Sequence, residues 1–381
     1  MRIELPLVDK FWYYVSSSVY LNWDVDLNFF KLFIKIILAV VLLIALCVVA
    51  LAYLRPSGIS PVSLILTQMA KRDYAWQCAP ALNQKSLNSK GNITWTKLQC
   101  QGAYPWAFSD KSKYTGVLTI NIVDANLSDP HTFVKPSIGN AQAKLPYHST
   151  LLEQSAAQPA FVAGINGGYF RTRPNRRDEN CFRRSLNKPM DASKHVGDSL
   201  LIIDNQVYST NCYGGALSEV GRSSLIQDAT TKQWRIERIK KDTVPANVAN
   251  ALGAGPGLIQ TIKGEPQIQI TWEGIFSTFE FSANTAVILA KDKQNDPHIL
   301  FFTVDGIDRK YGMTSIEMAN FIYNKIPDLF GLQLVSAMSM DQGNSTTMFV
   351  KSAENPIVSV TGKSGRVRPI YDGLFIGTTI P

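Results

Sequence analysis

The sequence predicts an α+β fold, in which a mixed, mostly antiparallel sheet core carries few helices and is preceded by one transmembrane helix. Three observations support this prediction. Helical and strand-like patterns do not alternate along the chain as they would in a doubly wound sheet. Only the stretch 314–330 shows clear helical periodicity within long strand-rich regions. An apolar run, Ile36–Leu54, is about as long as a bilayer span requires.

The apolar run divides the chain. Residues 1–35 are rich in aromatics and are expected to lie in the cytoplasm or at the membrane interface. Residues 36–54 form the predicted transmembrane helix, 55–110 a linker and disulfide-tied lead-in, and 111–381 the main domain. Cleavage after Ala52 is an alternative, since a small-x-small site precedes it. The 35 residues before the run are long for a signal peptide, which favours an uncleaved single-pass anchor.

Four cysteines follow the span and form two sequence-local pairs, Cys78 with Cys100 and Cys181 with Cys212. We expect both pairs to be disulfides, which form in oxidising compartments. The large domain is therefore predicted to be extracytoplasmic, whether periplasmic, lumenal or extracellular. The cysteines lack Cys-x-x-Cys spacing and no histidines cluster near them, so we expect no metal site and no cofactor.

The formal net charge of +8 favours an anionic partner or surface. The sequence contains no RNA-binding signature and no basic helix interleaved with aromatics, so nucleic acid is not an expected partner.

The first site-bearing segment follows a predicted buried strand, Phe161–Ile165. This strand leads into Asn166, Gly167 and Gly168, where paired glycines form either a bulge or a close approach of backbone to ligand. Six arginines follow between positions 171 and 184. They form either a solvated loop or, because guanidinium groups suit bidentate phosphate contacts, part of a binding site.

The second segment contains predicted strands at 285–291, 299–304 and 332–340 and the helix at 314–330. Asp305 and Asp341 each follow an apolar strand and precede or enter a glycine-containing turn, an arrangement that is common in active sites. Thr314 is the predicted N-cap of the helix, which Gly331 ends. Glu317 fits a capping box with Thr314, so it is either a cap or a third catalytic carboxylate.

Several short motifs occur in the order found in one known family. They are Asn166-Gly-Gly-Tyr-Phe170, Gly255-Pro-Gly-Leu-Ile259, Val304-Asp-Gly306 with Gly312-Met and Glu317, Asp341-x-Gly-x-Ser-Thr-Thr-Met348, and Arg368-Pro369. From Phe161 to Gly377 the chain resembles the phosphodiester glycosidase family. The resemblance implies catalytic roles for Asp305, Glu317 and Asp341. It implies substrate-binding roles for Asn166, Gly167, Gly168, Gly343, Ser345 and Arg368.

Two departures from the family pattern bear on the substrate. Asn284 stands where the family has arginine, and Asp341-Gln-Gly-Asn-Ser345 stands where it has Asp-Gly-Gly-Gly-Ser. Asn284 is kept as a candidate substrate-binding residue. We expect Arg171 or Arg173 to supply the missing positive charge.

The resemblance implies a membrane-anchored extracytoplasmic glycosidase that hydrolyses a sugar-1-phosphodiester or related glycosidic bond in a glycan or envelope polysaccharide. The expected partner is an anionic or phosphorylated glycan, with membrane attachment through the single span. A non-catalytic glycan- or cell-wall-binding protein that retains the fold is the alternative. A structural subunit of an envelope assembly is a third interpretation.

Overall fold

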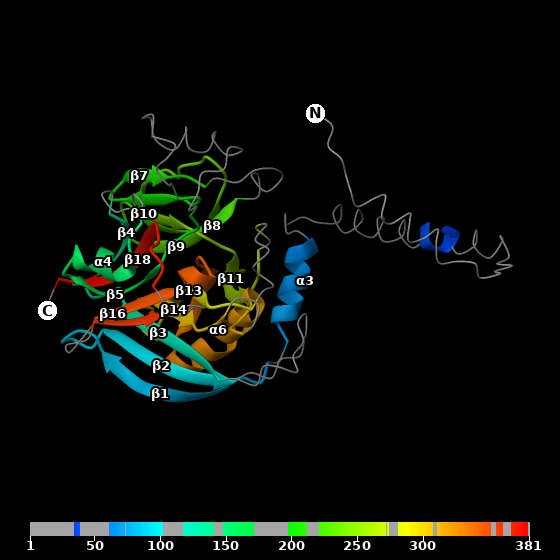
Figure 1. Ribbon diagram of the computed structural model, residues 1–381, viewed down its shortest axis with the longest axis horizontal. Coiled ribbons are helices and arrows are strands. Elements are labelled where there is room, and N and C mark those ends of the chain that lie inside the picture. The colour runs from blue at the N-terminus through cyan, green and yellow to red at the C-terminus, as the bar shows by residue number, and fades with distance from the viewer. Residues whose placement is uncertain are drawn as a thin grey trace, which may run out of the picture. The chain divides into compact units, whose positions relative to one another are not determined.

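The computed structural model describes residues 34–38, 61–72, 74–101, 117–140, 148–170, 197–211, 221–271, 273, 281–307, 311–351, 356–360 and 367–379 (Figure 1). The chain divides into two units, Met1–Pro61 and Val62–Pro381. Residues 34–38 of the first unit are helical, and the rest of the predicted span lies outside the described residues. In the described ranges, no helix has both the length and the apolar character needed to cross a membrane.

The largest sheet of the second unit has eight strands in the order β1-β2-β3-β14-β13-β15-β11-β12. Its strands are β1 (Gln77–Ser86), β2 (Ile93–Gln101), β3 (Leu118–Asn126), β11 (Gly257–Ile262), β12 (Glu265–Ile268), β13 (Asn284–Lys291), β14 (Pro297–Val304) and β15 (Gln333–Ser339). The predicted lead-in thus supplies two strands, β1 and β2, of the main sheet (Figure 1).

The other described strands form two five-stranded sheets. One has the order β7-β6-β10-β8-β9 and the other β17-β16-β5-β18-β4. Their strands are β4 (Thr132–Ile138), β5 (Phe161–Asn166), β6 (Leu201–Ile203), β7 (Gln206–Ser209), β8 (Arg222–Asp228), β9 (Trp234–Ile239), β10 (Val248–Gly253), β16 (Thr347–Lys351), β17 (Pro356–Val360) and β18 (Asp372–Thr378). All strand pairings among the described residues are antiparallel, which confirms the mostly antiparallel prediction.

Helices are few in the described part of the chain, as predicted: α3 (Pro61–Ala70), α4 (Leu151–Ala156), α6 (Ser315–Phe330) and a 3₁₀ turn, η5 (Gly343–Ser345). The predicted start and end of α6 are confirmed. Thr314 caps the first turn, and Gly331 ends the helix in the left-handed region with φ 66°.

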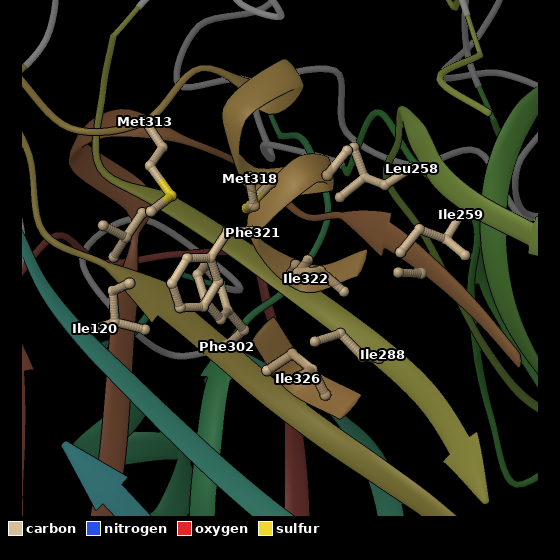
Figure 2. Packing of buried hydrophobic residues seen from close by; sticks show 14 of the residues in the cluster. Ile120, Leu258, Ile259, Ile288, Phe302, Met313, Met318, Phe321, Ile322 and Ile326 are labelled. Atoms are coloured by element: carbon tan, nitrogen blue, oxygen red, sulfur yellow. The ribbon is translucent and has the colours of Figure 1, made fainter. Parts of the chain in front are cut away.

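Helix α6 covers one face of the eight-stranded sheet. Its buried residues Phe321, Ile322 and Ile326 pack against Ile288 of β13 and Phe302 of β14 (Figure 2). The rings of Phe302 and Phe321 lie 5.7 Å apart. Burial of each such phenylalanine stabilises the fold by about 1.5–3 kcal/mol.

The opposite face of the same strands packs on the two smaller sheets. Because side chains alternate along a strand, Phe301 of β14 and Val287 of β13 belong to this second core, together with Ile165 of β5, Leu225 of β8 and Leu374 of β18. This core holds the end of β5 near the ends of the central strands of the large sheet.

The Cys78–Cys100 disulfide is present and joins facing residues of β1 and β2, as the sequence predicted. Cys181 and Cys212 lie outside the described residues, so their pairing stays a prediction.

Candidate functional site

One peptide group links two aspartates at the end of β5. The carbonyl oxygen of Gly167 accepts a hydrogen bond of 3.0 Å from the backbone N–H of Asp341. The N–H of Gly168, in the same peptide group, donates to Oδ1 of Asp372 over 2.7 Å. A Cβ atom on Gly167 would lie 2.1 Å from that same oxygen, so a side chain does not fit there. The glycines of this motif therefore permit a close backbone approach to Asp372.

Asn166 is fully buried and holds Asp341 in place. Its Nδ2 donates to the backbone oxygen of Asp341 over 2.8 Å. Its Oδ1 accepts from Oγ1 of Thr285 at 2.6 Å and from the N–H of Thr347 at 3.1 Å. The amide thus ties together segments of three strands and the turn after β15. The Asn166 side chain lies beside Asp341 and is bonded to protein groups, and its substrate-binding role stays a prediction.

Asp341 is half-buried directly after Met340, at the end of β15. Burial raises the pKa of its carboxyl to about 6. Four groups act in the opposite direction by stabilising the charged form: the Ser345 hydroxyl, the Arg368 guanidinium, the Gln342 N–H at 2.9 Å and the Arg222 guanidinium. Asp341 is therefore a carboxylate at neutral pH whose proton affinity suits acid–base chemistry.

Two arginines beside Asp341 are stacked on consecutive aromatic residues. The Arg222 guanidinium lies 4.7 Å from the centre of the Tyr169 ring, and that of Arg368 lies 4.9 Å from the centre of the Phe170 ring. Arg368 Nη1 also donates to Oγ of Ser345 over 3.0 Å. The predicted Arg368 is thus part of the site. Arg222, at the start of β8, was not predicted, because no local pattern distinguishes it from other exposed-strand arginines.

Asp372 is the second residue that the sequence did not indicate. It begins β18 and is 1% exposed. Burial raises its pKa to about 7; the Gly168 N–H lowers that pKa, and the negative charge of Asp341 raises it. Among the described residues, no group donates a hydrogen bond to its Oδ2. The only sequence signal was a single acidic residue at the head of an apolar run.

Asp305 lies at the same end of the large sheet as Asp341. Strand β13 separates the two, since it pairs with β14 on one side and β15 on the other. Oδ1 of Asp305 accepts from the N–H of Thr119 over 2.7 Å, and burial raises its pKa. The charge of Lys97 acts on Asp305, whereas Arg222 and Arg368 act on Asp341. The two aspartates are therefore in different electrostatic surroundings.

Glu317 forms the capping box that the sequence raised as an alternative. Its Oε2 accepts from the backbone N–H of Thr314 at 2.8 Å and from the Thr314 hydroxyl at 3.1 Å. It is 4% exposed, and its charge contributes, after burial, to raising the pKa of Tyr74 to about 12. This carboxylate is held at the start of α6.

Two of the residues that depart from the family pattern, Asn284 and Gln342, are directed into the protein interior, whereas the third, Asn344, is exposed. Asn284 is fully buried, and its Nδ2 donates to the backbone oxygens of Met313 and Ser282. Gln342 is buried, and its Nε2 donates to Oγ of Ser315 at 2.9 Å.

The turn that follows Gln342 is fixed by Gly343. Its φ of 65° favours glycine, and its N–H donates to the Ala283 oxygen over 2.8 Å. Arg171 and Arg173 lie outside the described residues. No group of histidine, cysteine, aspartate or glutamate side chains that could hold a metal is found in the described ranges.

The fold and site define a β-rich protein in which a carboxyl group of raised pKa lies beside two guanidinium groups, an arrangement suited to an anionic ligand. The phosphodiester glycosidase family model matches residues 160–377, more than half of the chain, and the chain belongs to this family.

A solved structure with 17% identity shares the fold. The zebrafish N-acetylglucosamine-1-phosphodiester alpha-N-acetylglucosaminidase catalytic domain, auto-inhibited by its pro-peptide, aligns with a TM-score of 0.50 and 17% identity, covering 82% of this chain and 92% of that chain. A hypothetical protein from Synechocystis aligns with a TM-score of 0.42 and 16% identity, covering 80% and 68%. No curated protein matches the chain.

Proposed function

We propose that this protein is a membrane-anchored, extracytoplasmic glycosidase that hydrolyses a sugar 1-phosphodiester in a glycan or envelope polysaccharide. The observation that carries the proposal is Asp341 beside Arg222 and Arg368, within a domain of the phosphodiester glycosidase family. The anchor rests on the apolar run Ile36–Leu54, and the extracytoplasmic location on the expected and observed disulfide chemistry.

The reaction breaks the bond between the anomeric carbon and a phosphate oxygen and forms a carbon–oxygen bond to water. The ionised Asp341 either removes the proton of the attacking water or attacks the anomeric carbon itself. The departing phosphate is a weak base and needs little protonation. Fixed positive charge from Arg222 and Arg368 stabilises the negative charge that accumulates on it.

The test uses the full chain purified in detergent. The substrate is N-acetylglucosamine 1-(methyl phosphate), chosen because the zebrafish protein is named for this class of bond. We expect release of free sugar and methyl phosphate by the wild type and a loss of several orders of magnitude in Asp341→Asn. Binding of the diester without turnover would instead favour the non-catalytic glycan-binding alternative.

A separate experiment tests the extracytoplasmic location of the large domain. Mass mapping under non-reducing conditions should find Cys181 joined to Cys212, and protease added to the cytoplasmic side should not reach the C-terminus. Free thiols at both positions, or cytoplasmic access to residues after the span, would contradict the extracytoplasmic part of the proposal.

A further inference from the structure

The Asp341–Asp372 pair is an unusual feature of the site because two acidic residues contact the same peptide group. The single peptide group between Gly167 and Gly168 contacts the backbone of Asp341 with its oxygen and the side chain of Asp372 with its N–H. Both aspartates are therefore fixed relative to the same rigid unit.

The two carboxyl groups differ in their surroundings. Asp341 is half-buried and lies near two guanidinium groups and the Ser345 hydroxyl. Asp372 is 1% exposed; the Gly168 N–H and its own backbone N–H stabilise its charged form, while Oδ2 accepts no hydrogen bond in the described part of the chain. A buried carboxylate that accepts few hydrogen bonds is disfavoured relative to its neutral acid. The nearby negative charge of Asp341 disfavours the charged form of Asp372 further.

We propose that Asp372 is a positioning residue that sets the net charge of the site, being neutral when an anionic substrate binds and weakening that binding when it loses its proton. This inference rests on the proposed function. The charges that act on Asp341 are those of Arg222 and Arg368, so with Asp372 neutral these two guanidinium groups exceed the charge of Asp341 by one. That excess matches the single negative charge of a phosphodiester. Ionisation of Asp372 cancels it. The buried Glu273 also lies near Arg222, but its carboxyl accepts from the N–H and hydroxyl of Ser223.

Charged and titratable neighbours come from several elements. Arg222 belongs to β8, Arg368 precedes β18, and Asp341 follows β15. His148 packs against Tyr371, the residue before Asp372, with ring centres 6.2 Å apart. A histidine ordinarily titrates near neutral pH, so its contribution has to be separated from that of Asp372.

The variant Asp372→Asn separates charge from structure. The asparagine Oδ1 can still accept from the Gly168 N–H, so the turn keeps its hydrogen bond while the titrating group is removed. His148→Gln is the matched control for the other titratable neighbour. Thermal unfolding of both variants establishes that they fold.

The probe is dimethyl phosphate, whose charge of one does not change across the pH range used, and its neutral counterpart is a methyl glycoside. Calorimetry on the full chain in detergent should show wild-type affinity for dimethyl phosphate falling on the order of tenfold between pH 6 and pH 8.5. The fall should shrink in Asp372→Asn to the small part that the ionisation of Asp341 just above pH 6 contributes, and it should persist in His148→Gln. Affinity for the neutral glycoside should not follow this pattern.

An unaltered fall in Asp372→Asn, or a pH-independent wild-type affinity, would overturn the proposal. A second measurement compares infrared titrations of the wild type and Asp372→Asn: the wild type should show a protonated-carboxyl band, disappearing near pH 7, that the variant lacks. Identical titrations of the two proteins would also overturn the proposal. Neither measurement needs turnover. A protein that binds the anion in this way without hydrolysing the diester would refute the proposed function and leave the role of Asp372 supported.

Discussion

The side-chain amide of Asn166 donates to the backbone oxygen of Asp341 across 2.8 Å, although the two residues are 175 positions apart in the sequence. Asn166 ends β5 in one sheet, and Asp341 follows β15 in another. The position of the candidate catalytic carboxylate therefore depends on how two sheets are joined, and not on its own strand alone.

Replacement of Asn166 by alanine should lower both stability and activity. The change leaves the Asp341 oxygen, the Thr285 hydroxyl and the Thr347 N–H without their partner, and each buried unsatisfied group costs about 1–3 kcal/mol. Denaturant unfolding measures the loss in free energy of unfolding. Asn324→Ala, at an exposed position of α6, is the control and should change stability little. Equal stabilities of Asn166→Ala and wild type would contradict the assigned role.

The pH dependence of turnover should follow the ionisation of Asp341. Because burial raises its pKa to about 6, the rate should fall as the pH drops through that value. The same raised pKa predicts that stability falls as the pH rises, whereas the rate increases. Between the unfolded pKa and about 6 the folded state holds a proton that the unfolded state releases, so rising pH destabilises the protein. Asp341→Asn should therefore be inactive and should gain melting temperature relative to wild type at pH 7 but not at pH 4.

Lysine should replace Arg368 only in part. It keeps the positive charge but loses the planar stack on Phe170 and the fixed bond to Ser345. We expect affinity for a charged diester to decrease in the order wild type, Arg368→Lys, Arg368→Ala, while affinity for a neutral glycoside changes little. Arg238→Ala, on exposed β9 surface, controls for lost net charge. Full recovery by lysine would show that only the charge matters.

Glu317→Ala should cost about 1 kcal/mol of stability, the usual value for a lost helix cap. Glu317→Gln can keep the capping box, since glutamine also fits this motif. If Glu317 acts only as a cap, the glutamine variant retains both melting temperature and rate. A large loss of rate with unchanged stability would establish the catalytic role that the family resemblance implies.

Reduction of Cys78–Cys100 should destabilise the protein by about 3 kcal/mol, since the disulfide closes a loop between residues 22 positions apart. Urea unfolding of the wild type and of the double variant Cys78→Ser, Cys100→Ser, both without reductant, measures this difference. Any remaining response of the double variant to reductant is expected to come from Cys181–Cys212.

Local signals predicted the elements well. Helix α6 begins after Thr314 and ends at Gly331 because capping and periodicity are encoded within the helix itself. Strand β13 begins one residue earlier than predicted, at Asn284. Asp341 was found because it ends a strand. Arg222 and Asp372 were not found, since they reach the site only through the packing of separate sheets, which leaves no local pattern.

Sequence reasoning also could not tell which polar groups point outward. Asn166 and Asn284 were expected to bind substrate, and that role stays a prediction; both side chains are fully buried and hydrogen-bonded to protein groups. An amide in a sequence motif can bind either a ligand or another group of the protein. The motif alone does not distinguish the two, because the difference depends on the neighbours that the fold brings to the amide.

The position of Cys78–Cys100 has a mechanical consequence. Tension applied from the N-terminal side would first meet α3 and Trp76, which are packed into the core and bonded to Asn320 of α6, and would then reach Gln77, the first residue of the outermost strand β1. A strand at a sheet edge is the one most easily pulled away, because only one neighbour holds it. The disulfide lies one residue after that entry point and ties β1 covalently to β2. Tension would then be shared between β1 and β2, and β1 would not separate from β2 by losing one hydrogen bond after another.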